Sequence, residues 1–310
     1  MDAQGLYVAI TRLGATAGQS LLVLPKADLL AATPSIANAT KWLNLTPFQV
    51  GLDPTPVVNF DGTGLPATLL SGSNAPMRFL TSTEIGGSIG SPVLASSEYI
   101  PVPANNAAFP IHGPQPGPKA DINAALYPWF SGNAVQVGGS IWAAQSTQVD
   151  GRAAVRWYEI DAATDILLQS GDLKHPTLDL YYPSIAVNEF DQVVIGMSGS
   201  SEQDFVGAYA AVGETLGGVT SFGDPLLLHA GLADFARINL YNGRNNWGDY
   251  SATVVDPSDP HRFWTFQEYV ETEDTYGVHI TELILIPEPS TGLLLLTGLG
   301  GLALRHRRRG

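Results

Sequence analysis

Cysteine is absent from this chain of 310 residues, and charged side chains are scarce. Without cysteine the chain forms no disulfide and offers neither a thiolate metal site nor a cysteine nucleophile. Only 14% of the residues are charged, and 29 acidic residues stand against 15 basic ones, for a net charge of −14. A chain this acidic repels the phosphates of nucleic acids, so we expect no nucleic-acid partner.

Long helical patterns are also missing, whereas glycine and proline are plentiful, with 33 and 22 residues. Helical periodicity is visible only at residues 26–32 and 122–126, each enough for one or two turns. Short runs of apolar and β-branched residues, several of them alternating with polar ones, predict half-buried strands instead. These runs cover residues 20–24, 49–52, 135–144, 153–160, 192–197, 205–212, 262–270 and 277–285. The sequence therefore predicts an all-β protein.

A faint internal repeat links residues 182–191 to residues 250–259, at an offset of 68 positions. In both copies a tyrosine is followed by a strand-like run and an acidic turn, and then by another strand. Residues 2–5 look like the latter half of the same unit. A recurring strand, acidic turn and strand predicts stacked antiparallel modules, as in the blades of a β-propeller.

The last 25 residues, 286–310, differ from the body formed by residues 1–285. They begin with a proline-rich step, continue through 13 uncharged residues of which seven are leucine, and end in an arginine cluster. Burying four arginines directly after the leucines inside a fold would be costly. We therefore expect a short C-terminal hydrophobic helix in a membrane, with the arginines on the cytoplasmic side. Without this tail the body has 11 basic and 28 acidic residues, a net charge of −17.

The order of these three parts resembles the PEP-CTERM sorting signal of Gram-negative bacteria, whose tail is also labelled an ice-binding-protein C-terminal segment. The matching residues are the motif Pro287, Glu288 and Pro289, followed by Ser290 and Thr291; the hydrophobic positions Gly292, Leu293, Leu294, Leu295, Leu296, Leu299, Leu302 and Leu304; and the cluster Arg305, Arg307, Arg308 and Arg309. The resemblance implies recognition by an exosortase, which is a membrane protease-transpeptidase. It also implies export, transient anchoring in the inner membrane, and delivery to the cell surface or extracellular matrix.

An exported body needs an export signal, and the first residues show neither a positive segment nor a long apolar stretch. We therefore expect a leader, and some further fold, to precede Met1 in the full protein.

The body also resembles a group of exported bacterial propeller-like proteins. Residues 246–257 and 263–269 resemble a final blade of that group, and residues 2–8 and 182–188 resemble earlier blades. The similarity is strong only over residues 150–285. It implies about five blades here, where members of the group have more, and hence an incomplete propeller.

Asp256 and Asp259 occupy a turn that leads into Phe263 and Trp264, and the pattern is similar to the Asp-box turns of sialidase-like propellers. In such a turn the acid caps the backbone and the aromatic side chain packs within the blade. A calcium site at Asp256 and Asp259 is a weaker alternative, because hard cations need more oxygen ligands than two side chains supply. The similarity also leaves an exported glycan-acting hydrolase of the sialidase type open as an alternative function.

Trp247, Asp249 and Tyr250 place two aromatic rings beside a carboxylate. Aromatic faces stack on sugar rings, and carboxylates accept hydrogen bonds from sugar hydroxyls. These three residues are therefore candidates for binding an extracellular polysaccharide. The competing interpretation is a structural cluster that closes a blade.

No catalytic residue is predicted. Gly86 to Gly90 match the G-x-S-x-G pattern of a nucleophile elbow, but no helix follows, so we expect a turn of small residues. The histidines lack metal-ligand spacing, and we expect no cofactor. The sequence thus predicts a non-enzymatic binding or matrix component, with the hydrolase as one alternative and an inert fragment with exposed blade edges as another.

Overall fold

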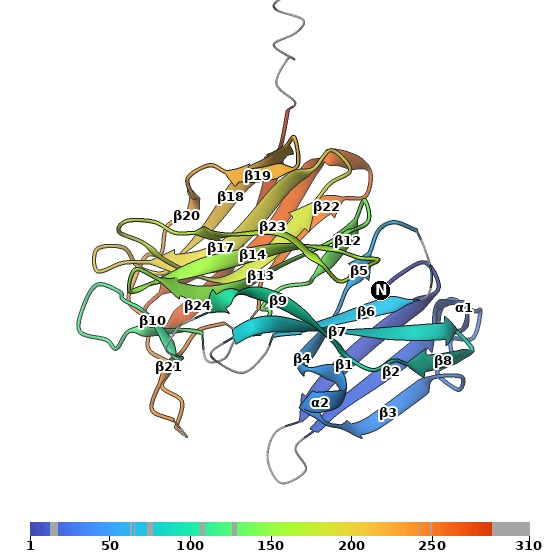
Figure 1. Cartoon of the computed structure of the whole chain (residues 1–310). Coiled ribbons are helices and arrows are strands. Elements are labelled where there is room, and N and C mark those ends of the chain that lie inside the picture. The colour runs from blue at the N-terminus through green and yellow to red at the C-terminus, as the bar shows by residue number, and fades with distance from the viewer. Residues whose placement is uncertain are drawn as a thin grey trace, which may run out of the picture.

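The computed structural model describes residues 1–12, 18–62, 64, 66–72, 77–105, 109–125, 129–240, 242–248 and 250–286. Within these residues the chain is built almost entirely of strands (Figure 1). The two helices found there are single turns, α1 (Lys26–Leu29) and α2 (Pro47–Val50). The prediction of an all-β body is therefore confirmed. The predicted C-terminal helix and its membrane segment lie outside the described residues.

The strands of the first third of the chain form two antiparallel sheets. Sheet 1 consists of β1 (Gly5–Arg12), β2 (Gly18–Pro25) and β3 (Thr40–Leu45). Sheet 2 consists of β4 (Leu52–Pro56), β6 (Ala67–Gly72), β7 (Met77–Ser88), β8 (Ser91–Leu94) and β9 (Glu98–Asn105). Tyr7 and Leu21 of sheet 1 pack against Leu69 and Ile85 of sheet 2 in one buried cluster. The alternation of apolar residues along these strands thus buries the facing sides of both sheets.

The middle of the chain forms two further sheets. Sheet 3 consists of β5 (Val58–Asn59), β12 (Val135–Val137), β13 (Ser140–Val149), β14 (Arg152–Asp161) and β15 (Leu167–Leu173). Sheet 4 consists of β16 (Asp179–Val187), β17 (Gln192–Ser200), β18 (Gly207–Leu216), β19 (Val219–Phe222) and β20 (Leu226–His229). Every residue of β16 and β17 is buried, because neighbouring sheets cover both faces of sheet 4.

The last strands form sheet 5 and one small sheet. Sheet 5 consists of β22 (Ala252–Asp256), β23 (Asp259–Thr272) and β24 (Thr275–Ile284). The small sheet consists of β10 (Ile111–Gly113), β11 (Ile122–Ala125) and β21 (Asn245–Asn246). β23 alternates as its sequence predicts, since Phe263, Thr265 and Gln267 are buried and the residues between them are more exposed.

The five larger sheets pack on one another in series. Buried clusters join sheets 1 and 2, sheets 2 and 3, sheets 3 and 4, and sheets 4 and 5. In Figure 1 the blue and cyan strands of sheets 1 and 2 lie on one side of the molecule, and the yellow and orange strands of sheets 4 and 5 on the other. The outer face of β24 carries exposed apolar side chains, among them Val278, Ile280 and Ile284, and no sheet of the described residues covers it.

Three local predictions need correction. The helix predicted at residues 122–126 is wrong for residues 122–125, because Ile122–Ala125 form β11, which pairs with β10 and β21; residue 126 lies outside the described residues. Gln49 and Val50 belong to α2 rather than to a strand, since a capping box at Thr46 and Gln49 favours a helical turn there. The predicted strand 135–144 is a hairpin, because Gly138 and Gly139 take positive φ values of 60° and 81° and turn the chain.

Candidate functional site

Two cavities contain the candidate ligand-binding residues. The larger, here called the inter-sheet cavity, measures about 630 Å³ and lies between β1, β4, residues 129–133 and residues 250–252. Its lining consists mainly of alanine, threonine, proline, serine and glycine residues, with the aromatic residues Trp129, Phe130 and Tyr250. Asp53 is the one charged residue among its lining residues, all of which belong to the described part of the chain.

The smaller cavity, here called the Trp247 cavity, measures about 310 Å³. It lies between residues 235–237 and 246–248 on one side and the hairpin of β23 and β24 on the other. Its lining combines aromatic rings with one cation, one carboxylate and one amide: Phe235, Trp247, Tyr276, Arg237, Glu268, Asn246 and Gly248.

The structure separates the residues that the sequence grouped as one binding cluster. Trp247 is 4% exposed, donates its indole N–H to Ser198 Oγ at 3.1 Å, and meets the Phe235 ring edge-on at a centroid distance of 5.0 Å. Tyr250 is 74% exposed and lines the inter-sheet cavity instead. Asp249 lies outside the described residues. Trp247 is therefore packed as the interpretation of a structural cluster predicts, and it also lines a cavity.

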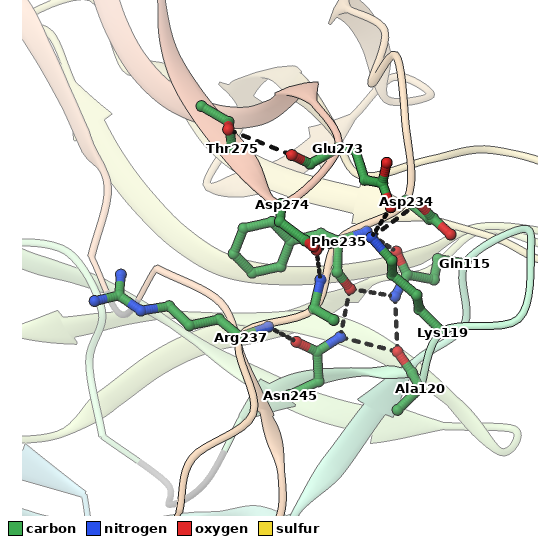
Figure 2. Close-up of polar contacts among 11 residues, drawn as sticks. Gln115, Lys119, Ala120, Asp234, Phe235, Arg237, Asn245, Glu273, Asp274 and Thr275 are labelled. Carbon is green, nitrogen blue, oxygen red and sulfur yellow. Dashed lines mark hydrogen bonds and ion pairs between the residues drawn. The ribbon is translucent and has the colours of Figure 1, made fainter.

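A lysine surrounded by three carboxylates holds the walls of the Trp247 cavity together (Figure 2). Lys119 Nζ lies 2.8 Å from Asp274, 3.1 Å from Glu273 and 3.2 Å from Asp234. Partial burial lowers the pKa of Lys119, but the hydrogen bonds to Asp274, Glu273 and Asp234 outweigh it and raise the pKa overall. The lysine thus stays charged and ties the loop before β11 to the segment at 234 and to the turn between β23 and β24.

Two buried amide side chains hold the backbone at Phe235 and Arg237 in place. Gln115 and Asn245 both donate to the carbonyls of Ala120 and Phe235, over 2.7–2.9 Å. Their amide oxygens accept the backbone N–H groups of Phe235 and Arg237, at 2.9 and 2.7 Å. In Figure 2 these bonds converge on Ala120 and Phe235, while the Arg237 guanidinium points away from them. The backbone at Arg237 is therefore fixed, and its side chain remains outside the network.

Gly248 allows a close approach that another residue would prevent. A Cβ placed on Gly248 would lie 1.6 Å from a carboxylate oxygen of Glu268. Any side chain here must displace Glu268 from the cavity wall. Glycine is thus required for the present position of that carboxylate.

Asp256 caps its turn as the sequence predicted. Its Oδ1 accepts the backbone N–H and the hydroxyl of Ser258, and its Oδ2 accepts the indole N–H of Trp264 at 2.9 Å. These hydrogen bonds to the charged form, that of the Ser258 hydroxyl first, lower the pKa of Asp256 to about 2. Asp259 lies 3.6 Å from Arg262 and accepts the backbone N–H of His261. Both carboxylates of the calcium candidate are therefore engaged in the turn. Across the described residues, no group of three or more His, Asp or Glu is arranged to hold a metal ion.

The last predicted features are the nucleophile-elbow pattern and the C-terminal tail. Gly86 to Ser88 end β7, and the chain turns directly into β8, with Ser88 opposite Ser91, so a hairpin turn stands where an elbow would need a helix. The sorting motif, the leucine segment and the arginine cluster lie outside the described residues, from Pro287 to Gly310. Among the described helices, none has the length and apolar character needed to cross a bilayer.

The sequence alone does not reveal the other residues that line the Trp247 cavity. Arg237, Glu268 and Tyr276 come from a loop and from two paired strands, and no spacing along the chain links them. Only the pairing of Glu268 with Val278 and of Val270 with Tyr276 brings them to one end of the hairpin.

No protein-family model and no curated protein matches this chain. Solved structures with similar arrangements share little sequence with it. A protein of unknown function from Dyadobacter fermentans is 12% identical, with a TM-score of 0.44, over 88% of this chain and 85% of its own. A polysaccharide lyase of the ulvan lyase family PL25 is 10% identical, with a TM-score of 0.46, over 91% of this chain and 64% of its own. An α-L-arabinanase from Penicillium chrysogenum is 9% identical, with a TM-score of 0.37, over 91% and 93%.

Proposed function

We propose that this chain is an exported protein of the cell envelope that binds an extracellular polysaccharide without cleaving it. The observation that carries the proposal is the lining of the inter-sheet cavity, which is partly aromatic and uncharged except for a single carboxylate, Asp53. Aromatic and neutral polar groups in a concave site suit sugar rings and their hydroxyls.

The same lining disfavours the hydrolase alternative. Most glycosidases use two carboxyl groups, about 5–5.5 Å or about 6.5–9.5 Å apart. In the described residues, the inter-sheet cavity has Asp53 as its one acid and the Trp247 cavity has Glu268. A lone carboxylate in each cavity supports binding more than hydrolysis by that route.

For the fold, we propose an incomplete β-propeller of about five blades, each formed by one of the larger sheets. The serial packing of sheets 1 to 5 supports this arrangement. The apolar outer face of β24 supports an incomplete ring, because a closed ring would cover such a face with another blade.

For the tail, we propose that residues 286–310 direct sorting by an exosortase, with transient anchoring in the inner membrane. The order of a proline-rich step, an apolar segment and an arginine cluster supports this role. To test it, the chain is given a working leader and a fused reporter, and its location is compared with that of a Pro287→Ala, Glu288→Ala, Pro289→Ala triple variant. We expect the parent at the cell surface and the triple variant retained in the membrane. A reporter that stays in the cytosol in both cases contradicts the proposal.

The binding proposal is tested on the full chain with an array of neutral and acidic oligosaccharides and, in parallel, an assay for released reducing ends. We expect binding without release, and weaker binding for Tyr250→Ala, which removes an exposed ring from the inter-sheet cavity. Tyr99→Ala is the matched control, because Tyr99 is 57% exposed on β9 and does not line this cavity. Release of reducing ends would favour the hydrolase, and absence of binding to every glycan would refute the proposal.

A further inference from the structure

We propose that the Trp247 cavity binds a carboxylate-bearing sugar of an acidic polysaccharide, and that Arg237 holds the carboxylate. This inference rests on the proposed function and names a ligand class and a second subsite for it. Arg237, the groups around it and the rigid walls of the cavity support this assignment.

Arg237 is a cation without a carboxylate partner in the described part of the chain. Arg152, Arg156 and Arg262 are paired with carboxylates, whereas Arg12, Arg78, Arg237 and Arg244 form no ion pair with another described residue. Of these four, Arg237 is the one that lines the Trp247 cavity. Only the backbone N–H of Arg237 is bonded within the amide network, and Figure 2 shows its guanidinium outside that network. In a chain with a net charge of −14, a cavity with an unpaired guanidinium offers what a carboxylate ligand needs.

The neighbours of Arg237 suit a sugar ring rather than a bare anion. Tyr276 is 48% exposed, and both its ring and the buried Trp247 line the cavity. The amide of Asn246 and the carboxylate of Glu268 supply a donor and acceptors for hydroxyl groups. A small inorganic anion would use only the donors, the Arg237 guanidinium and the Asn246 amide, and neither the aromatic rings nor the Glu268 carboxylate.

The size of the cavity limits the ligand. Its volume of about 310 Å³ lies at the lower end of ligand pockets, which range from roughly 300 to 1,000 Å³. We therefore assign it one or two sugar residues of a longer chain, with the rest of the polysaccharide outside.

The walls are held in place before a ligand arrives. Asp274, in the hairpin turn two residues before Tyr276, accepts the backbone N–H of Ala236 at 2.6 Å, directly beside Arg237. Lys119 then binds Asp274 and Asp234 together. The segment that carries Arg237 and the hairpin that carries Tyr276 are thus clamped to each other, which reduces the entropy lost on binding.

The net charge of the whole chain makes the proposed binding of an acidic glycan selective. Long-range repulsion opposes a polyanion at a net charge of −14, so general attraction cannot account for its binding. Affinity for an acidic glycan must then come from a local ion pair in the cavity. Loss of one bidentate ion pair corresponds to a loss of affinity on the order of 10- to 100-fold.

The experiment measures binding of the full chain, by calorimetry, to oligomers of galacturonate, glucuronate, mannuronate and guluronate, each beside its methyl ester. The ester keeps the ring and hydroxyls and removes only the charge. We expect at least one acidic oligomer to bind at least about 10-fold more tightly than its ester, since the ester cannot form the ion pair. Arg237→Gln should remove that difference and leave ester binding unchanged, while Tyr276→Ala should weaken both.

Arg78→Gln is the matched control, because Arg78 is exposed on β7 and its loss changes the net charge equally without touching the cavity. Equal binding of acid and ester, or equal effects of Arg237→Gln and Arg78→Gln, would overturn the inference and leave the proposed function standing. Failure of every neutral, acidic and esterified glycan to bind would refute both. An unchanged unfolding curve of Arg237→Gln confirms that any loss is local.

Discussion

Gln115 and Asn245 form a redundant pair, and a double-mutant cycle should reveal it. Each amide donates to both the Ala120 and the Phe235 carbonyls, so either amide alone can satisfy the two acceptors. Both side chains are buried, at 6% and 2% exposure. Removing one amide therefore leaves both carbonyls with a donor, whereas removing both amides leaves neither carbonyl with one.

The single variants lose bonds but leave only one group without a partner. Asn245→Ala orphans the backbone N–H of Arg237, and Gln115→Ala orphans that of Phe235, while both carbonyls keep a donor. Since an unsatisfied buried group costs about 1–3 kcal/mol, we expect each variant to lower the free energy of unfolding by about 2 kcal/mol.

The double variant also leaves both carbonyls unsatisfied. Each carbonyl adds a cost of about 2 kcal/mol that neither single variant incurs, so the loss should exceed the sum of the two single losses by about 4 kcal/mol. Urea unfolding followed by tryptophan fluorescence measures all four corners of the cycle. Gln145→Ala combined with Asn245→Ala is the control, because Gln145 donates to Tyr158 and shares no partner with Asn245. Additivity of Gln115→Ala and Asn245→Ala to within about 0.5 kcal/mol would refute the reasoning.

Two further substitutions test the turn and the cavity wall. The pKa of Asp256 in the folded chain is about 2, below its unfolded value, so its charge stabilises the fold above about pH 4 and this contribution is lost as the pH falls toward 2. Asp256→Asn should therefore lower the melting temperature at pH 7 but not at pH 2, and an equal loss at both pH values would contradict the role of the charge. Gly248→Ala should push the Glu268 carboxylate out of the cavity wall at a cost in stability of no more than about 0.5 kcal/mol, because its Cβ meets only the far end of a flexible side chain. A clearly larger loss in urea unfolding than that of Gly86→Ala, which has open space at its position, would contradict this account.

Much of the local structure follows from short-range patterns. Alternation along residues 262–270 predicts a half-buried strand, and β23 buries the expected side. The acidic turn at Asp256 forms as predicted, because an Asp side chain bonds to the backbone two residues on wherever the chain turns there. Residues 122–126 show the limit, since a run of small apolar residues fits a helix or a buried strand equally well until its partner is known.

The binding cluster was only partly predictable for the same reason. Trp247 and Tyr250 are close neighbours along the chain, yet they line different cavities. Arg237, Glu268 and Tyr276 share a cavity although up to 39 positions separate them.

The strand content, the turn at Asp256 and the contrast between body and tail can be read from the amino-acid sequence, because each depends on residues within a few positions of one another. Which side chains line a cavity, and which cations remain unpaired, follows from the folded arrangement alone. Those properties depend on strand register and on the packing of distant segments, and neither leaves a local signal in the chain.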